Sequence, residues 1–391
     1  MVFSRFAAFP ASDLLSATQL ISLHLLLNRP PPDGESPDHL FGPYISVLPR
    51  EFDSHPLTWA VQHKFGGPIP LTSSGENLLP KLPCSVLSAL TKLEAKFWDD
   101  WKTVCQYVGD SLDLLDRSDG PLKMSDTTDI ASTTHYLWAW MNVNTRCLYD
   151  RLTRSKSDPD NISLCPVFDF ANHKWTAPTM RVAPSDVDVR NFVVRDVGSN
   201  LTCVTCCEDV VEDKELYLTY GEHPNRTLFV EYGFINEVSE HEFVSGAYAG
   251  EVDVQDIVED IDWTMHSAPQ PAHPSYRLIT ALRLYHIVPA DSHDVPSDND
   301  TILNPWSDTL SGRKDVISDE NEAAWRSTLL NISNTVAKRA EASMASMAGM
   351  PMEKEQPEWY EWMLHNIRML WWEERYVAMA VADSVRNGVE F

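Results

Sequence analysis

The residues best suited to chemistry stand at the ends of two short apolar runs. The first run, CPVFDFANH, begins at Cys165, contains Asp169 and ends in Asn172 and His173. A run of this length and composition predicts a buried strand, so its polar groups must pair inside the protein or face a ligand. The second run, ELYLTYG, alternates as a strand does and ends at Tyr220 and a glycine. Together the two ends offer amide, imidazole and phenol groups that can bind and orient a ligand.

Each of these signals is weak when it is taken alone. An Asn-His pair at a strand end is more often a turn with satisfied side chains, and a tyrosine there more often packs with its hydroxyl in water. The sequence has no glycine-rich phosphate loop, no GxSxG motif and no HExxH motif. Cys203, Cys206 and Cys207 look like half of a zinc site, but no second ligand pair follows, so we expect no metal.

Helical segments precede these runs and must support them. The leucine-dense residues 14–27 predict a buried helix that stops at a triple proline, and residues 33–54 predict extended loops and turns. Residues 56–150 return to a helical pattern, with one strong helix around residues 87–101 and a second over residues 134–152. Arg146 lies beside the apolar face of that helix, where a lone arginine usually extends its charge to the edge.

The second half of the chain changes from strands to helices. Residues 163–220 predict short strands separated by proline, aspartate, glycine and asparagine. The acidic residues 251–262 are interpreted as a solvated junction between domains. Beyond them, apolar residues at helical spacing predict helices near residues 278–285, 321–347 and 358–386. Asp319 and Glu322 are expected to cap the second of these helices. The sequence therefore predicts an α+β protein.

Composition limits the classes of partner. The 391 residues are enough for two domains with separate cores. A formal net charge of −26 opposes binding to nucleic acid and favours basic protein partners. Seven cysteines, an odd number, do not indicate a disulfide framework. Because no secretory signal and no apolar run of about 20 residues is visible, we expect the cytosol or nucleus and no membrane partner.

In this order and spacing, the motifs resemble those of the SET-domain protein-lysine methyltransferases. The segments that carry the resemblance are DFANH at residues 169–173, ELYLTYG at 215–221, Asn225 and YGF at 232–234. Within that family, the chain is similar to the branch typified by Rubisco large-subunit lysine methyltransferase. The segments WAWMNVNTR, which ends at Arg146, and YISVLP, which begins at Tyr44, are similar to segments of that branch.

The resemblance implies a cofactor and the residues that hold it. Asn172 and His173 would bind S-adenosylmethionine, partly through their main-chain groups, and Asp169 would shape the same pocket. Arg146 would pair with the carboxylate of the cofactor. An arginine–carboxylate pair is bidentate and directional, so lysine would be a poor replacement there.

The resemblance also implies catalysis on a lysine side chain of a basic protein. Tyr220 would be the catalytic tyrosine, and Tyr232 and Phe234 would line the channel that holds the target amine. A free lysine has a pKa near 10.4, so its deprotonation near neutral pH costs about 4 kcal/mol. A dry aromatic channel beside a positive sulfonium lowers that pKa, and the transfer itself needs alignment more than a strong base.

The resemblance implies a β-rich SET fold of the pseudoknot type over residues 1–250. A helical insertion at about residues 55–150 would interrupt it, and an all-α domain over residues 265–391 would follow, similar to the substrate-binding domain of the branch. Residues 1–33 contain no glycine, so the glycine-rich strand that wraps the cofactor in this family would be missing and the SET domain would be N-terminally incomplete.

Two alternatives to a monomeric lysine methyltransferase stay open from the sequence. One is a catalytically inactive SET-fold protein that binds a partner through its C-terminal helices. The other is a histidine methyltransferase, because a sibling branch of the same fold methylates histidine. Tyr232 in the channel is more similar to the lysine-directed members.

Overall fold

The computed structural model describes most of the chain. The described residues are 15–67, 78–108, 128–150, 152, 155–184, 187–188, 193–194, 201–205, 210–257, 263–287, 299–348 and 356–391. The chain divides into two compact units. The N-terminal unit comprises residues 1–79, 90–223 and 227–236, and the C-terminal unit comprises residues 80–89, 224–226 and 237–391.

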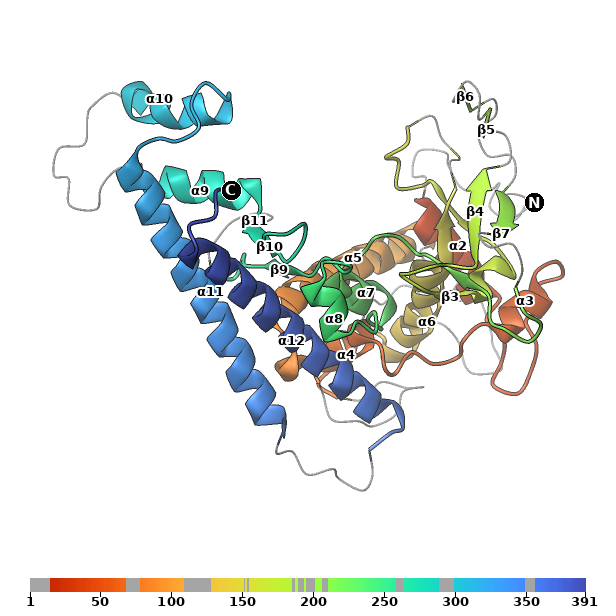
Figure 1. Cartoon of the computed structure of the whole chain (residues 1–391). Coiled ribbons are helices and arrows are strands. Elements are labelled where there is room, and N and C mark those ends of the chain that lie inside the picture. Colours follow the sequence, from red (N-terminus) through yellow and green to blue (C-terminus); the bar gives the residue numbers. More distant parts are fainter. Residues whose placement is uncertain are drawn as a thin grey trace. The chain divides into compact units, whose positions relative to one another are not determined.

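Helices contribute more residues to the N-terminal unit than strands do (Figure 1). They are α2 (Ala17–Leu27), α3 (Gly42–Val47), α4 (Pro56–Lys64), most of α5 (Cys84–Val108), α6 (Ile130–Arg146) and most of α7 (Asn225–Tyr232). Ser16 and Gln19 form a reciprocal capping box at the start of α2, and the Asp129 side chain accepts the amide of Ser132 at the start of α6. These caps fix where the buried helices begin.

The strands of the same unit are short and pair in twos. The antiparallel pairs are β1 (Cys147–Tyr149) with β2 (Ile162–Leu164), β4 (Met180–Pro184) with β7 (Leu201–Thr205), and β5 (Val187–Asp188) with β6 (Val193–Val194). One parallel pair joins β3 (Asn172–His173) to β8 (Tyr217–Leu218). The combination of helices and small sheets confirms the α+β class.

An aromatic core joins α5 to α6. The Trp101 and Tyr136 rings stack with their centroids 4.6 Å apart, and Phe97 meets Trp140 edge-on at 5.7 Å. All four side chains are fully buried. Asp100 ties the elements together, since its carboxylate accepts the Trp140 indole N–H at 2.9 Å and the Gln19 amide of α2 at 2.8 Å.

The C-terminal unit contains a helical pair and a small sheet. Its elements are α8 (Glu240–Val244), β9 (Glu251–Asp253), β10 (Thr264–His266), β11 (His273–Pro274), α9 (Tyr276–Tyr285), α10 (Asn299–Leu310), α11 (Asp319–Ala348) and α12 (Trp359–Arg386). Helices α11 and α12 lie side by side (Figure 1). Trp325, Val336 and Val377 are among the fully buried residues of their shared core.

Several expected boundaries differ from the observed ones. Residues 42–47, expected to be extended, form α3, because Pro43 near its start is compatible with a first helical turn. Helix α6 ends at Arg146, and the next three residues form β1. Helix α11 begins after Ser318, whose hydroxyl accepts the amide of Asn321, while Glu322 pairs with Arg283 at 2.7 Å. The expected capping pair at the start of α11 is therefore wrong.

The C-terminal unit is also less helical than expected. The described part of the acidic run, residues 251–257, contributes β9 to a three-stranded sheet, and Val252 and Val254 are buried within it. The prediction of a solvated run is therefore wrong for these residues, because alternate apolar side chains turn into the core. Helix α10 was not expected, since Pro305 stands inside it.

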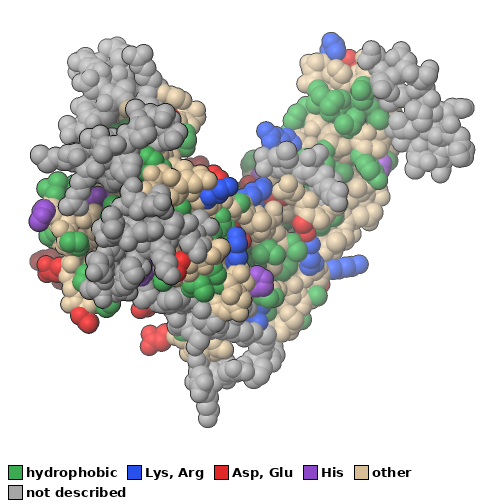
Figure 2. Space-filling view, turned by 180° about the vertical axis from the view of Figure 1, so that it is seen from behind, with side chains coloured by type: hydrophobic (Ala, Val, Ile, Leu, Met, Phe, Trp, Pro, Cys, Tyr) green, Lys and Arg blue, Asp and Glu red, His purple; other side chains and the backbone are tan. Residues whose placement is uncertain are grey.

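Hydrophobic side chains also reach the surface, as the face in Figure 2 shows. Tyr285 is 76% exposed and Val167 is 71% exposed. Among the helices that the structure describes, none has the length and hydropathy needed to cross a membrane. Cys206 and Cys207 of the cysteine-rich run lie outside the described residues.

Removal of one core ring tests the packing between α5 and α6. We expect Trp101→Ala to lower the free energy of unfolding by about 3 kcal/mol or more, because the cavity left by a buried ring cannot collapse fully. The matched control is Trp362→Ala on α12, since that side chain is 46% exposed. The control should change the free energy by less than about 0.5 kcal/mol. Urea unfolding measures both variants, and equal losses would contradict the packing described.

His55 makes the stability of the N-terminal unit depend on pH. Its Nδ1 accepts the Leu57 amide at 3.2 Å at the start of α4, and burial lowers its pKa to about 4. Gly233, with a φ of +81°, lies so close that an added Cβ would stand 2.9 Å from the His55 ring. A side chain at Gly233 would therefore push against this ring.

Because the folded pKa of His55 is lowered, protons bind the unfolded chain more readily. The stability that neutral His55 contributes is complete above the ordinary pKa of about 6.5, and is lost as the pH falls toward about 4. We expect His55→Asn, which keeps a capping side chain, to reduce the slope of unfolding free energy against pH by up to about 1.4 kcal/mol per unit in this window. Urea titrations at several pH values measure the slope, and an unchanged slope would refute this assignment.

Candidate functional site

The apolar run before Asn172 is a turn and not a buried strand. Val167 has a φ of +78° and is 71% exposed, a strained conformation for a β-branched residue. The 3-10 turn η3 (Phe168–Phe170) follows and leaves Phe170 48% exposed. The turn buries the Asp169 side chain instead. The prediction of a buried strand is therefore wrong, because the run serves to bury one carboxylate.

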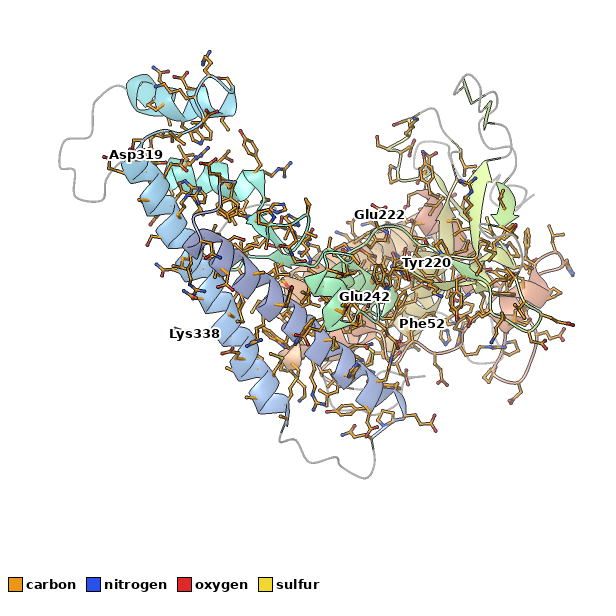
Figure 3. The ribbon with its side chains drawn as sticks, viewed as in Figure 1. Phe52, Tyr220, Glu222, Glu242, Asp319 and Lys338 are labelled. Carbon is orange, nitrogen blue, oxygen red and sulfur yellow. The ribbon has the colours of Figure 1, made fainter. Side chains whose placement is uncertain are left out.

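The two polar strand ends meet through the parallel pair β3–β8. Asn172 stands opposite Tyr217, and His173 stands opposite Leu218. Two residues beyond β8, the Tyr220 amide donates to Nδ1 of His173 at 3.0 Å. The Tyr220 hydroxyl donates to the carbonyl oxygen of Ala171 at 2.9 Å. Residues that lie far apart in the sequence are thus brought into direct contact, with Tyr220 labelled in Figure 3.

Asp169, in the turn η3 that precedes β3, is the centre of a second polar group. Its Oδ2 accepts the Tyr44 hydroxyl at 2.7 Å and pairs with the Arg146 guanidinium at 3.1 Å. Burial and the nearby carboxylate raise the pKa of Tyr44 well above its ordinary value. The second carboxylate oxygen of Asp169 and Nε of Arg146 are buried and form no hydrogen bond. Both side chains therefore retain unused bonding capacity in a nearly dry setting.

Aromatic rings gather around Tyr220. The Tyr232 ring lies 5.1 Å from it and the Phe234 ring 6.1 Å, while those two rings are 6.0 Å apart. Burial raises the pKa of Tyr220, and burial with the Glu231 charge raises the pKa of Tyr232 to about 12. Both phenols are therefore protonated near neutral pH and can donate a hydrogen bond.

A cavity of about 470 Å³ lies among these groups. Arg146, Asp169, Tyr220 and Tyr232 are among the residues that line it, and its size falls in the range of small-molecule sites. Asn172, His173 and Phe234 are not among the lining residues. Four of the seven residues singled out from the sequence thus share one cavity, and the other three contact or neighbour its wall.

The side chains of Asn172 and Asn225 form hydrogen bonds with residues that do not line the cavity. The Asn172 amide is exposed and donates to Glu215 at 2.6 Å. The Asn225 side chain is buried in the C-terminal unit, where it donates to Glu373 at 2.8 Å. Burial raises the pKa of Glu373 to about 8. Asn225 therefore has a structural partner within its own unit.

The sequence assigned no role in the site to three residues that shape it. Tyr44 was expected to be extended and instead reaches Asp169 from α3. Asn236 contacts Nε2 of His173 at 3.1 Å, and Asn144 donates to the Glu231 carbonyl at 3.0 Å beside Tyr232. Isolated tyrosine and asparagine residues carry no periodic signal, so these contacts could not be predicted. In the part of the chain that the structure describes, no cluster of three histidine, cysteine or acidic residues could hold a metal ion.

Comparison with known proteins gives the geometry a family context. No family model matches the chain. It is 26% identical over 363 residues to human SET domain-containing protein 4, which covers 89% of this chain and 70% of that protein. It is 27% identical over 191 residues to ribosomal lysine N-methyltransferase set11 of Schizosaccharomyces pombe, covering 49% of this chain and 37% of that protein.

A further similarity covers much of the same stretch. The chain is 23% identical over 261 residues to ribosomal lysine N-methyltransferase 2 of Saccharomyces cerevisiae, covering 63% of this chain and 50% of that protein. This chain is a relative of SET-domain proteins. The resemblance drawn from the motifs is confirmed, and the SET-domain relatives are consistent with the Rubisco large-subunit methyltransferase-like branch. The matched stretch spans half or less of the two yeast proteins.

The Tyr44–Asp169 bond offers a test of how this SET-domain relative holds its buried carboxylate. We expect Tyr44→Phe to lower the free energy of unfolding by about 1.5–3 kcal/mol, because the variant loses a hydrogen bond to a buried charged group. The matched control is Tyr149→Phe, since Tyr149 is 59% exposed and donates to a surface carbonyl oxygen. The control should change stability by less than about 0.5 kcal/mol. Denaturant titration compares the two, and an effect of Tyr44→Phe as small as the control would refute the buried bond.

Proposed function

We propose that the chain is an S-adenosylmethionine-dependent protein-lysine N-methyltransferase. Its fold would be a pseudoknot-type SET domain over residues 1–250, with a helical insertion at about residues 55–150. A mainly helical domain over residues 265–391 would follow it. The similarity to two ribosomal lysine N-methyltransferases supports the reaction class. The observation that carries the proposal is the cavity that Arg146, Asp169, Tyr220 and Tyr232 share.

The residues around the cavity fit a cofactor with an amino-acid end. Nε of Arg146 is buried without a hydrogen-bond partner, as is Oδ1 of Asp169. A carboxylate would satisfy the guanidinium, and an ammonium or hydroxyl would satisfy the carboxylate oxygen. Asn172 and His173, which form β3, would add main-chain contacts to the cofactor. One unused hydrogen-bonding atom on each member of this ion pair therefore matches a zwitterionic ligand.

S-adenosylmethionine, when bound, supplies a methyl group on a positive sulfonium. The chain itself has to align a neutral amine with that group and keep water away. Tyr220, Tyr232 and Phe234 would hold the amine between their rings, since a dry aromatic setting lowers the pKa of a lysine by desolvation. Tyr220 keeps its proton because burial raises its pKa. Its hydroxyl oxygen, whose proton goes to the Ala171 carbonyl oxygen, can accept an N–H of the amine and so orient the lone pair without acting as a base.

The substrate would be a basic protein segment. The chain carries a net charge of −26, which attracts lysine-rich segments and speeds their encounter. Glu215 and Glu222 are exposed on either side of Tyr220 along the chain, and Figure 3 labels Tyr220 and Glu222. These charges would draw a basic segment toward the aromatic channel.

Calorimetry with S-adenosylmethionine separates this proposal from a catalytically inactive SET-fold protein. We expect saturable heat from the wild type and a weaker response from Arg146→Ala, because that variant loses the guanidinium that would pair with the cofactor carboxylate. Absence of heat and of any thermal shift from the folded wild type would favour the inactive alternative.

Methyl transfer tests the role of Tyr220. We expect Tyr220→Phe to lower the rate of tritiated methyl transfer to basic proteins by about 100-fold, the size typical of losing one positioned hydrogen-bonding group. The matched control is Tyr217→Phe on β8, three residues before Tyr220, because the Tyr217 hydroxyl donates to Glu215 and Tyr217 does not line the cavity. The control should retain most of the activity. Equal rates for Tyr220→Phe and the wild type would exclude Tyr220 as the catalytic residue.

A further inference from the structure

His173 is held at both nitrogens of its ring. Its Nδ1 accepts the main-chain N–H of Tyr220 at 3.0 Å, and its Nε2 lies 3.1 Å from Oδ1 of Asn236. A main-chain N–H can only donate, so Nδ1 must be free of a proton. The neutral ring then carries its proton on Nε2 and donates it to Asn236. One arrangement of protons therefore satisfies both contacts.

We propose that Asn236 is a positioning residue of this site, which fixes His173 in the Nε2–H form and through it fixes the main chain of Tyr220. The inference rests on the proposed function and extends it to a residue that does not line the cavity. Asn236 lies three residues beyond Gly233 and is 5% exposed, so its amide cannot be replaced readily by water. Its effect on the reaction would pass through two hydrogen bonds to Tyr220.

The surroundings of His173 favour the neutral ring. Burial lowers its pKa and repulsion from His223 lowers it further, whereas the hydrogen bond to Asn236 raises it. The Tyr220 and Phe234 rings pack 5.2 Å and 5.7 Å from it. The ammonium of the adjacent Lys174 lies over the Tyr217 ring at 5.3 Å. In the part of the chain that the structure describes, no carboxylate forms an ion pair with His173.

Protonation would break this arrangement. An imidazolium carries a proton on each nitrogen, so Nδ1 would present a proton to the Tyr220 N–H. The main chain of Tyr220 would lose its acceptor, and the catalytic hydroxyl would lose its fixed position. Activity should therefore fall on the acid side as His173 becomes protonated.

The variant Asn236→Asp tests the inference through the pH profile. An aspartate still accepts the Nε2 proton, but it stabilises the imidazolium and raises the pKa of His173. We expect the acid limb of the kcat profile to move up by about one pH unit, which lowers kcat by up to about tenfold at pH values below the wild-type pKa of His173. Near pH 9 the variant should recover to within about threefold of the wild type, because the ring is neutral again.

Two further variants separate positioning from general damage. Asn236→Ala removes the acceptor at every pH, so it should lower kcat across the whole profile. Asn161→Asp changes another buried asparagine, which bonds to the Ser155 carbonyl oxygen and the Leu152 amide, neither of which belongs to this contact chain. It should leave the acid limb in place. A uniform loss in Asn236→Asp, with no shift of the limb, would overturn the inference.

A measurement on the wild type decides the inference independently of activity. In protein labelled with nitrogen-15 histidine, NMR spectra report the tautomer and the pKa of each ring. We expect His173 in the Nε2–H form near neutral pH, with a pKa that rises by about one unit in Asn236→Asp. A His173 ring mainly in the Nδ1–H form would overturn the inference. If the wild type transfers no methyl group, the proposed function fails, while these spectra still accept or reject the role of Asn236.

Discussion

The parallel pairing of β3 with β8 is the constraint on which the site depends. It joins only two residues on each strand, so the surrounding polar contacts must hold its register. Lys174 donates its amide to the Leu218 carbonyl at 2.8 Å, and the Thr219 hydroxyl donates to the Lys174 carbonyl at 3.0 Å. A slip of one residue would turn His173 and Tyr220 to opposite faces. The pairing therefore sets which side chains meet at the cavity.

The buried carboxylate of Asp169 organises the other wall. A charge in a dry setting costs several kcal/mol unless it is paired, and Arg146 and Tyr44 supply that pairing. The turn that buries Asp169 also contains Val167 at a positive φ, a conformation that costs about 1–3 kcal/mol. Strain and buried charge together are typical of a site that is shaped for a ligand. They also explain why an apolar run there leaves valine and phenylalanine exposed.

The sequence predicted much of the architecture because its signals are periodic. The helices α11 and α12 follow from apolar spacing, which tertiary packing reinforces. The turn at Val167 and the helix α3 were not predicted. A short apolar run, or a segment that contains a proline, is compatible with more than one backbone conformation. Asn236 and Tyr44 were missed for a different reason. Their importance comes from long-range contacts, which no local pattern encodes.

The central claim is that the polar strand ends, Arg146 and the aromatic rings form a single methyl-donor site. A crystal structure of the protein with S-adenosylhomocysteine, the product that keeps the amino-acid end of the cofactor, tests this claim most directly. We expect density for the ligand in the cavity, with its carboxylate on Arg146 and its sulfur toward Tyr220 and Tyr232. Ligand density at a distant surface, with this cavity holding solvent alone at saturating ligand, would contradict the account.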